Sequence, residues 1–290
     1  MRPNLRTFEQ ARPLRPAARF LPILPASVAV RPFLYSAFLL TAALLASTTA
    51  AQAQEAQDTP GYQKEFTYGI NLNTNAGLIG GVAVRSTRRI TDDWARFWIL
   101  EGVEVKTRKE QRVQNNIGGV YVRGKTNYLF ALRPTVGVQR TIFRKAAESG
   151  VEVDGMLGAG PSIALLLPYY IYFDYTPKPD PQTNPNPRED IRPEQYDPVK
   201  HADVSRIYDR APIFSGIGDV KPNIGAHLRG ALNFEYGRYR DAVAGVEAGM
   251  LVEAYTKRLV TLEVPPTPTD KLNNNVFTSV YVTLYIGSRK

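Results

Sequence analysis

Residues 276–290 read VFTSVYVTLYIGSRK, and this stretch alternates between two kinds of side chain. One register is mostly apolar from Val276 to Ile286, and the other mixes aromatic and hydroxyl groups from Phe277 to Tyr285. A two-residue period with one apolar face predicts a β-strand whose two faces meet different surroundings. We expect this strand to pair with the first strand of the chain, because closure removes the unpaired sheet edges.

Seven earlier stretches alternate in the same way. We predict strands at residues 65–73, 78–88, 95–106, 127–139, 151–165, 223–236 and 244–255. The connections before the third, fifth and seventh strands are short, and those before the fourth, sixth and eighth are long. Short turns at one end and long loops at the other are typical of outer-membrane barrels. The sequence therefore predicts an all-β fold, an eight-stranded antiparallel up-and-down transmembrane β-barrel.

Some segments do not follow the simple pattern. In the third predicted strand, Phe97 and Ile99 share a face with Glu101, and a bulge near Glu101 and Gly102 would restore the phase. Pro134 lies within the fourth strand and argues against a central ladder position unless a bulge is present. We predict one or two helical turns at 141–148, irregular loops at 107–126 and 176–219, and a possible extension of the fifth strand through 169–173.

The N-terminal region predicts an export signal. Residues 33–46 form the longest apolar run; six arginines precede it, and Ala51-Gln52-Ala53 follows. This order predicts a signal peptide at 1–53. A retained anchor helix is the alternative, although the run is shorter than the ~20 apolar residues that a membrane helix requires. We predict a short disordered lead-in at 54–64 and the barrel at 65–290.

Composition narrows the possible functions. The net charge is +9, but residues 1–53 contain six Arg and one Glu, so the remainder carries 30 − 26 = +4. This modest charge gives no indication of nucleic-acid binding. The absence of cysteine excludes disulfides and cysteine-based zinc sites. The two histidines lack ligand-spaced partners, so we expect neither a metal site nor a cofactor.

The second register of the later strands contains the candidate site residues. They are Arg133, Glu152, Asp154, His227, Arg229, Glu247 and Glu253. In a membrane barrel this register faces the lumen, which in an eight-stranded barrel is wide enough only for side chains. We expect Arg133 and Arg229 to pair with Glu247, Glu253 or Asp154. A structural role in neutralising buried charge is favoured, and a binding or proton-handling cluster is the alternative.

A catalytic interpretation depends on His227, because His201 falls in the long loop. Ser162 and Glu247 would supply the nucleophile and the acid of such a site. An envelope lipid-modifying enzyme is therefore one alternative function. A soluble lipocalin-like periplasmic barrel is another, since its apolar register would face inward. The favoured hypothesis is a non-enzymatic outer-membrane barrel that contacts outer-membrane lipid and the barrel-assembly machinery, and whose long loops bind an extracellular or envelope partner.

Five short stretches resemble a known family. They are residues 124–134 (GKTNYLFALRP), 143–146 (FRKA), 168–170 (PYY), 253–257 (EAYTK) and 285–290 (YIGSRK). Together they resemble an uncharacterised outer-membrane β-barrel family of Bacteroidetes-type bacteria. The resemblance extends from about Phe66 to the end of the chain. It implies the fold and the location, and no functional residues carry over from it.

Overall fold

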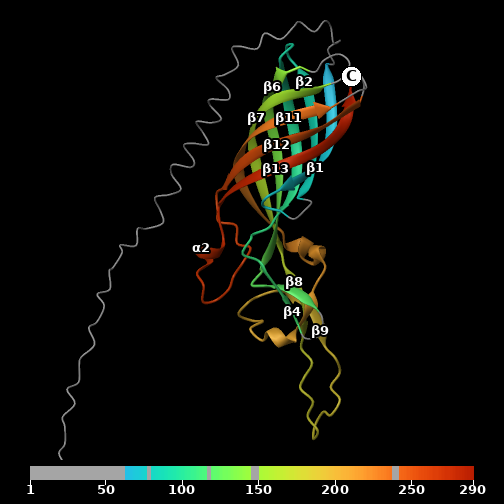
Figure 1. Cartoon of the computed structure of the whole chain (residues 1–290). Helices are drawn as coiled ribbons and strands as arrows, with labels where there is room; N and C mark the ends of the chain where they lie inside the picture. Colours follow the sequence, from blue (N-terminus) through green and yellow to red (C-terminus); the bar gives the residue numbers. More distant parts are fainter. Residues whose placement is uncertain (1–62, 77–79, 116–118, 145–149, 237–241) are drawn as a thin grey trace, which may run out of the picture. The chain divides into compact units, whose positions relative to one another are not determined.

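A computed structural model describes residues 63–76, 80–115, 119–144, 150–236 and 242–290. The predicted signal peptide and most of the predicted lead-in lie outside these residues. So does the turn between the sixth and seventh predicted strands. Eight strands form a closed barrel in the order β1-β13-β12-β11-β7-β6-β3-β2 (Figure 1). They are β1 (Lys64–Asn73), β2 (Gly81–Arg89), β3 (Trp94–Val105), β6 (Asn127–Phe143), β7 (Val151–Pro168), β11 (Lys221–Tyr236), β12 (Ala242–Tyr255) and β13 (Val276–Arg289).

The first and last strands close the barrel, as the sequence predicts. β1 and β13 pair antiparallel from Glu65 opposite Arg289 to Asn73 opposite Tyr281. Each of the other barrel strands also pairs antiparallel with its two neighbours. Every barrel strand is therefore paired on both edges, which confirms the predicted eight-stranded antiparallel up-and-down barrel.

The alternation in sequence becomes an alternation between the outer wall and the lumen. On β11, Ile224 and Leu228 point outward with 64% and 56% of their surface exposed, while His227 and Arg229 are buried. On β13, Val280 and Leu284 are exposed, and Tyr281 and Thr283 are buried. The apolar register thus forms the outer wall, and the polar register fills the lumen.

β3 departs from this rule, without a bulge, because most of its lumen-facing residues are also apolar. Its pairing with β2 and β6 runs unbroken through Glu101 and Gly102, so the bulge considered for this position is absent. Phe97, Ile99, Val103 and Val105 therefore face the lumen beside Glu101. The outward face of β3 instead contains Trp94, Trp98 and Leu100, each nearly half exposed. The lumen consequently contains apolar side chains from β3, which the distribution of charged residues along the sequence does not predict.

The centre of β6 contains a gap in its ladder with β7. Leu132 pairs with Ile163 and Val136 with Ala159, so the register is unchanged across the gap and places Pro134 opposite Pro161. Neither proline has an N–H to donate, which explains why the ladder is interrupted without a bulge. β6 continues to Phe143, so the helical turn predicted from Thr141 is wrong over its first residues, and residues 145–149 lie outside the described part.

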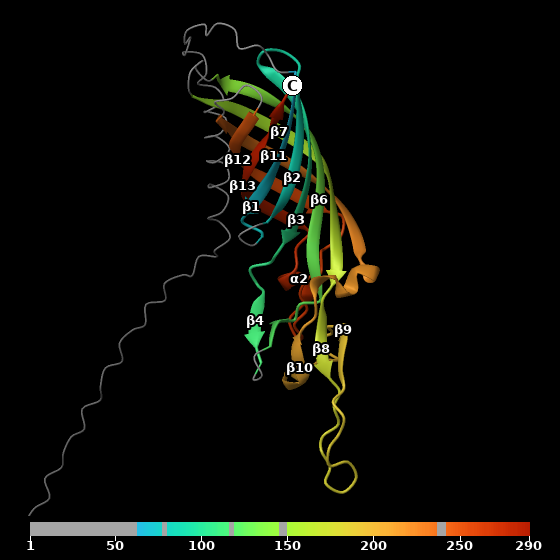
Figure 2. The same cartoon turned by 90° about the vertical axis from the view of Figure 1, so that its right-hand side faces the viewer.

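The two long loops are more ordered than predicted. Residues 107–126 contain the hairpin β4 (Gln111–Gln114) and β5 (Val120–Arg123). The predicted extension of the fifth strand is a separate strand, β8 (Tyr170–Asp174). It lies between β9 (Ile191–Gln195) and β10 (Ile207–Arg210) in a three-stranded sheet (Figure 2). Residues 176–219 are therefore not wholly irregular. Among the described residues, no helix has the length and apolar character needed to cross a bilayer.

We call residues 107–126 and 169–220 the loop module. It includes two short 3-10 helices, η1 (Val204–Arg206) and η2 (Ile213–Asp219), in addition to its five strands. β7, β11 and β6 meet the module at the end of the barrel where the long connections lie, which we call the long-loop end. A third connection at this end contains the short helix α2 (Thr269–Leu272).

Candidate functional site

All seven candidate residues are buried in the barrel. They lie on β6, β7, β11 and β12, and their alternation with exposed apolar neighbours places them in the lumen. They do not form one cluster. Arg133, Arg229, Glu247 and Glu253 belong to a chain of ion pairs, whereas Glu152 and Asp154 lie toward the short-turn end of β7 and outside this chain.

The ion-pair chain links guanidinium and carboxylate groups in alternation. Arg133 donates to Glu253 at 2.7 and 2.9 Å and to Glu101 at 3.2 Å. Arg229 donates to the other Glu101 oxygen at 2.9 Å and to Glu247 at 3.0 Å. Arg85 extends the chain, with contacts to Glu247 at 3.2 Å and Glu65 at 3.3 Å. Each guanidinium thus contacts two carboxylates, which offsets the cost of burying these charges.

The sequence prediction missed several members of this network. Glu101 bridges Arg133 and Arg229. In the sequence, Glu101 shares a register with Phe97, and this register faces the lumen when β3 contains no bulge. That shared register is the signal that indicates a lumen position for Glu101. Tyr281 donates its hydroxyl to Glu247 at 2.7 Å and accepts from Arg229 Nε at 2.9 Å. Its ring also lies 4.5 Å from the Arg229 guanidinium. Tyrosines in the polar register of β13 therefore complete the network.

Arg133 pairs with Glu253 and Arg229 with Glu247, two of the three expected partners, and Asp154 pairs with neither arginine. Its carboxylate accepts from Gln139 and Thr141 at 2.9 Å and from Asn233 at 3.1 Å. These donors all lie on β6 and β11, the two neighbours of β7. Neutral hydrogen bonds therefore hold this fully buried carboxylate in place.

Glu152 lies opposite Glu235 in the β7–β11 register, and both are buried. Arg289, near the end of β13, contacts Glu235 and also donates to Glu65 at 3.0 Å. The last residues of the chain thus bring a positive charge to the acidic end of the lumen.

His227 contacts hydroxyl groups through both ring nitrogens. Its Nδ1 lies 3.0 Å from Ser162 Oγ, and its Nε2 lies 2.8 Å from Thr135 Oγ1. Ser162 is also 3.4 Å from Glu253, whereas Glu247 contacts arginines and Tyr281. Ser162 is fully buried and His227 is 4% exposed. The Ser162–His227 proximity that a catalytic arrangement would need is present, but the acid does not lie behind the imidazole and the pair is buried.

The long-loop end of the lumen is closed by apolar side chains. Leu259 packs with Val103, Val105, Leu129 and Tyr255 in one buried cluster. Asn273 holds the connection in place. Its side chain accepts from the backbone N–H groups of residues 261 and 262 at 2.8 and 3.0 Å, and donates to two carbonyls at 2.8 and 2.9 Å.

A cavity of about 20 Å³ between Arg85, Arg229 and Glu247 has room for about one water.

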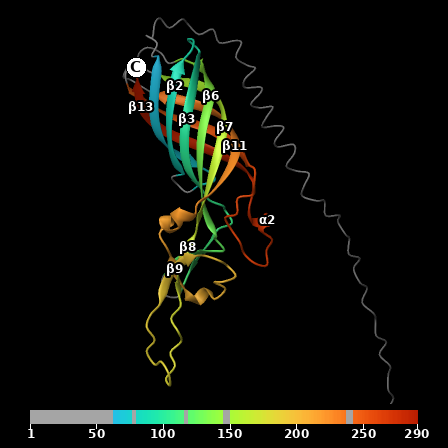
Figure 3. The ribbon, with the colours of Figure 1, turned by 180° about the vertical axis from the view of Figure 1, so that it is seen from behind.

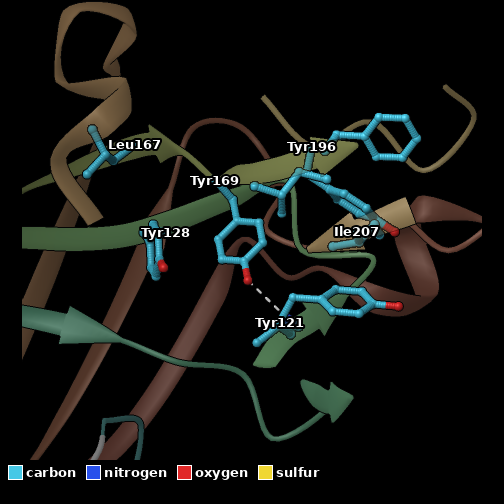
Figure 4. Close-up of a cluster of buried hydrophobic side chains, with 9 residues drawn as sticks. Tyr121, Tyr128, Leu167, Tyr169, Tyr196 and Ile207 are labelled. Carbon is cyan, nitrogen blue, oxygen red and sulfur yellow. Dashed lines mark hydrogen bonds between the residues drawn. The ribbon is translucent and has the colours of Figure 1, made fainter. Parts of the chain in front are cut away.

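The loop module has a conventional aromatic core. Tyr169 packs against Tyr128 at a ring-centroid distance of 5.2 Å, and its hydroxyl accepts from the Val122 N–H at 3.0 Å (Figure 4). Ile171 and Ile207 are fully buried in the same cluster. Burial raises the pKa of the Tyr169 hydroxyl, so it stays neutral across the physiological range. The module is therefore folded around a hydrophobic cluster that Tyr128 and Leu167, at the ends of β6 and β7, also join.

His201, in the long loop, is part of this module rather than a separate site. It packs against the Phe173 ring at 4.7 Å, and its Nε2 lies 2.7 Å from Glu194. Glu194 also accepts from Tyr175 at 2.5 Å and contacts Lys200. Burial opposes the charge on Glu194, but these donors outweigh it and lower the pKa of Glu194 to about 2. Among the described residues, no group of three or more acidic, histidine or cysteine side chains is placed to hold a metal.

No protein-family model matches the chain, and no curated protein matches it significantly. Solved structures that are similar to it at low identity include two bacterial surface proteins. One is Ail, the attachment invasion locus protein of Yersinia pestis, solved with the heparin analogue sucrose octasulfate. It is 10% identical with a TM-score of 0.33, covering 79% of this chain and 99% of Ail. The other is Neisserial surface protein A, 9% identical with a TM-score of 0.33, covering 79% of this chain and 97% of that one. Neither likeness assigns a ligand to this protein.

Proposed function

We propose that this protein is a non-enzymatic outer-membrane barrel that spans the bilayer with its eight strands and presents the loop module to a partner outside the cell. The inverted polarity of the barrel carries the proposal. Val82, Val136, Leu157 and Leu228 are each more than half exposed on the outer wall, while the arginines and glutamates of the ion-pair chain are buried. A wall of this kind is stable in lipid, and closure pairs the strands on both edges as lipid requires, apart from the ladder gap at Pro134 and Pro161.

The lumen supports a structural role over transport. Ion pairs and a buried cluster of Phe97, Ile99 and Met156 fill its centre. The buried cluster around Leu259 covers its long-loop end. In this proposal the interior is a plug of charged side chains that stabilises the barrel and leaves no path for transport. The same geometry disfavours a lipocalin-like binding barrel, whose ligand would need an open apolar interior.

The partners follow from the two surfaces. Outer-membrane lipid surrounds the wall, and the barrel-assembly machinery inserts the exported chain. The loop module supplies a folded surface for an extracellular or envelope component, and we expect no nucleic acid among its partners. Membership of the Bacteroidetes-type family remains a prediction from the short stretches quoted above.

Fractionation of cells that express the full chain tests this proposal. The protein is expected in the outer-membrane fraction, resistant to alkaline carbonate and released by detergent. Unheated samples are expected to migrate faster on a gel than boiled ones, because a closed barrel resists detergent unfolding. Release of the protein into the periplasmic fraction without detergent would contradict the proposal and favour the lipocalin-like alternative.

The 3.0 Å approach of Ser162 to His227 favours a second candidate, an enzyme that modifies envelope lipids. Replacing His227 with Asn and comparing the lipid A and phospholipid profiles of the cells tests this candidate. We expect unchanged profiles, because the pair is buried. A modified lipid that disappears in the variant, while heat-modifiable migration is retained, would establish the enzyme instead.

A further inference from the structure

The short helix η2 exposes large apolar side chains at the rim of the barrel. Phe214 is 66% exposed and Ile217 is 65% exposed, and Ile213 beside them is 37% exposed. The helix immediately precedes β11, so it lies where the chain re-enters the barrel wall (Figure 3). A folded water-soluble surface gains nothing from large side chains placed in this way.

The position of η2 is fixed by close packing. Gly216 is buried against the end of β7, and a Cβ at this position would approach the Pro168 carbonyl oxygen and the Tyr170 ring to 2.9 Å. The Tyr170 hydroxyl also reaches Asp219 at 3.5 Å. The apolar side chains of η2 are therefore held beside the barrel by the contacts of Gly216, at the kink between the two turns of η2, and of Asp219.

The exposed face of η2 continues the apolar belt of the barrel. The first pairs of β11 with β7 join Lys221 to Leu166 and Ile224 to Ile163. Ile224 is the first strongly exposed apolar residue of β11, at 64%, and it follows Ile217 by seven residues. Lys221 lies between them in the sequence and is exposed. An apolar pair next to a lysine is the arrangement that places side chains at the boundary between acyl chains and headgroups.

We propose that η2 inserts Phe214 and Ile217 into the outer leaflet, so that lipid contacts the loop module as well as the barrel wall. This inference rests on the membrane location proposed above. Lipid is the occupant that the structure favours, because the apolar face of η2 is continuous with the lipid-facing belt and has the same chemistry. The insertion fixes the height and orientation of the module above the membrane.

The absence of cysteine allows a direct test with single labelled positions. Phe214→Cys probes η2 and Leu228→Cys probes the barrel belt. Val199→Cys is the matched control, because Val199 is an apolar residue of the loop module that is 74% exposed and lies away from η2 in the sequence. Each variant is labelled with an environment-sensitive fluorophore and refolded into phosphatidylcholine vesicles with or without brominated acyl chains. Ile217→Cys is the second η2 probe in case Phe214→Cys does not refold.

We expect bromine to quench the label at 214 at least about twofold more than the label at 199, with 228 quenched most. Quenching at 214 no greater than at 199, while 228 is quenched, would overturn the η2 inference and leave the membrane location intact. Equal quenching at 214 and 199 at a high level would also overturn it, because insertion would not be specific to η2. A label at 228 that is not quenched would remove the membrane location and this inference together.

Discussion

The barrel and the loop module of this chain follow opposite rules of burial. In the barrel, arginines and glutamates are buried, and leucine, valine and isoleucine cover the outer wall. In the loop module, Tyr169, Ile171 and Ile207 form the core, and most charged side chains, such as Arg188 and Arg192, are exposed. Under the proposed membrane location, this difference fits one sequence to two media, lipid around the strands and water around the loops.

The two cores also differ in what a substitution removes. The module core is held by apolar burial, where loss of a few methylene groups leaves a cavity. The lumen is held by paired charges, where loss of one partner leaves the other charge buried and uncompensated. Substitutions in the lumen, on the outer wall and in the loop module test this contrast.

Arg229→Leu is expected to have the largest effect. The substitution leaves Glu101 and Glu247 without one guanidinium each, and a broken buried pair costs about 3–5 kcal/mol. The free energy of unfolding in urea, measured in lipid vesicles, is the readout. Arg188→Leu in the loop module is the control, since an exposed arginine is expected to change stability by less than about 0.5 kcal/mol. Equal effects of the two substitutions would refute the charged-lumen description.

Leu228→Arg places a charge on the outer wall. Near the bilayer midplane, an arginine on the lipid face of a barrel costs about 2–4 kcal/mol. Val199→Arg is the control, because Val199 is even more exposed, at 74% against 56%, but lies in the module. The same vesicle unfolding assay should show a change within about 0.5 kcal/mol for Val199→Arg. If Leu228→Arg is equally neutral, the outer wall faces water.

Tyr169→Phe tests the module separately. Loss of the hydroxyl leaves the buried Val122 N–H without its acceptor, which is expected to cost about 1–3 kcal/mol. Limited proteolysis of folded barrels should cleave the module faster, while heat-modifiable migration stays unchanged. Tyr208→Phe, at a residue that is 46% exposed, is the control and should leave the cleavage rate as it is. A loss of barrel migration would show that the module is not an independent core.

The lowered pKa of Glu194 predicts that acid slightly lowers the stability of the module. Its pKa is lowered to about 2 from an ordinary value of 4.5, so its contribution to stability is present above pH 4.5 and is lost as the pH falls toward 2. Pepsin cleavage of the module should therefore accelerate between pH 4 and 2 in the wild-type chain. Glu194→Gln should be cleaved faster at pH 4 and show a smaller acceleration, whereas Glu189→Gln should behave as wild type. An identical pH profile for Glu194→Gln would rule out this contribution.

The sequence predicts the barrel because most strands alternate strictly between outward apolar residues and lumen-facing polar ones. β11 and β13 are read correctly for that reason. β3 is not, because Phe97 and Ile99 fill the lumen beside Glu101 and blur the contrast between its faces. The burial of Arg133 and Arg229 can be predicted from their register. Their pairing with one shared carboxylate, that of Glu101, depends on how the strands align across the barrel. The short strands β9 and β10 contain too few residues to show a period, so the sequence predicts a loop there. It predicts β8 only as an extension of the fifth strand.

The most direct test of the whole account is photolabelling with a lipid that carries a photoreactive group on its acyl chain. The protein is refolded into vesicles that contain this lipid, and the modified residues are located by mass spectrometry. We predict label on outward residues such as Leu228, Leu232 and Leu284, and none on Leu251 in the lumen or Ile171 in the module core. Label on the lumen residues, or a wall free of label in folded protein, would contradict the account.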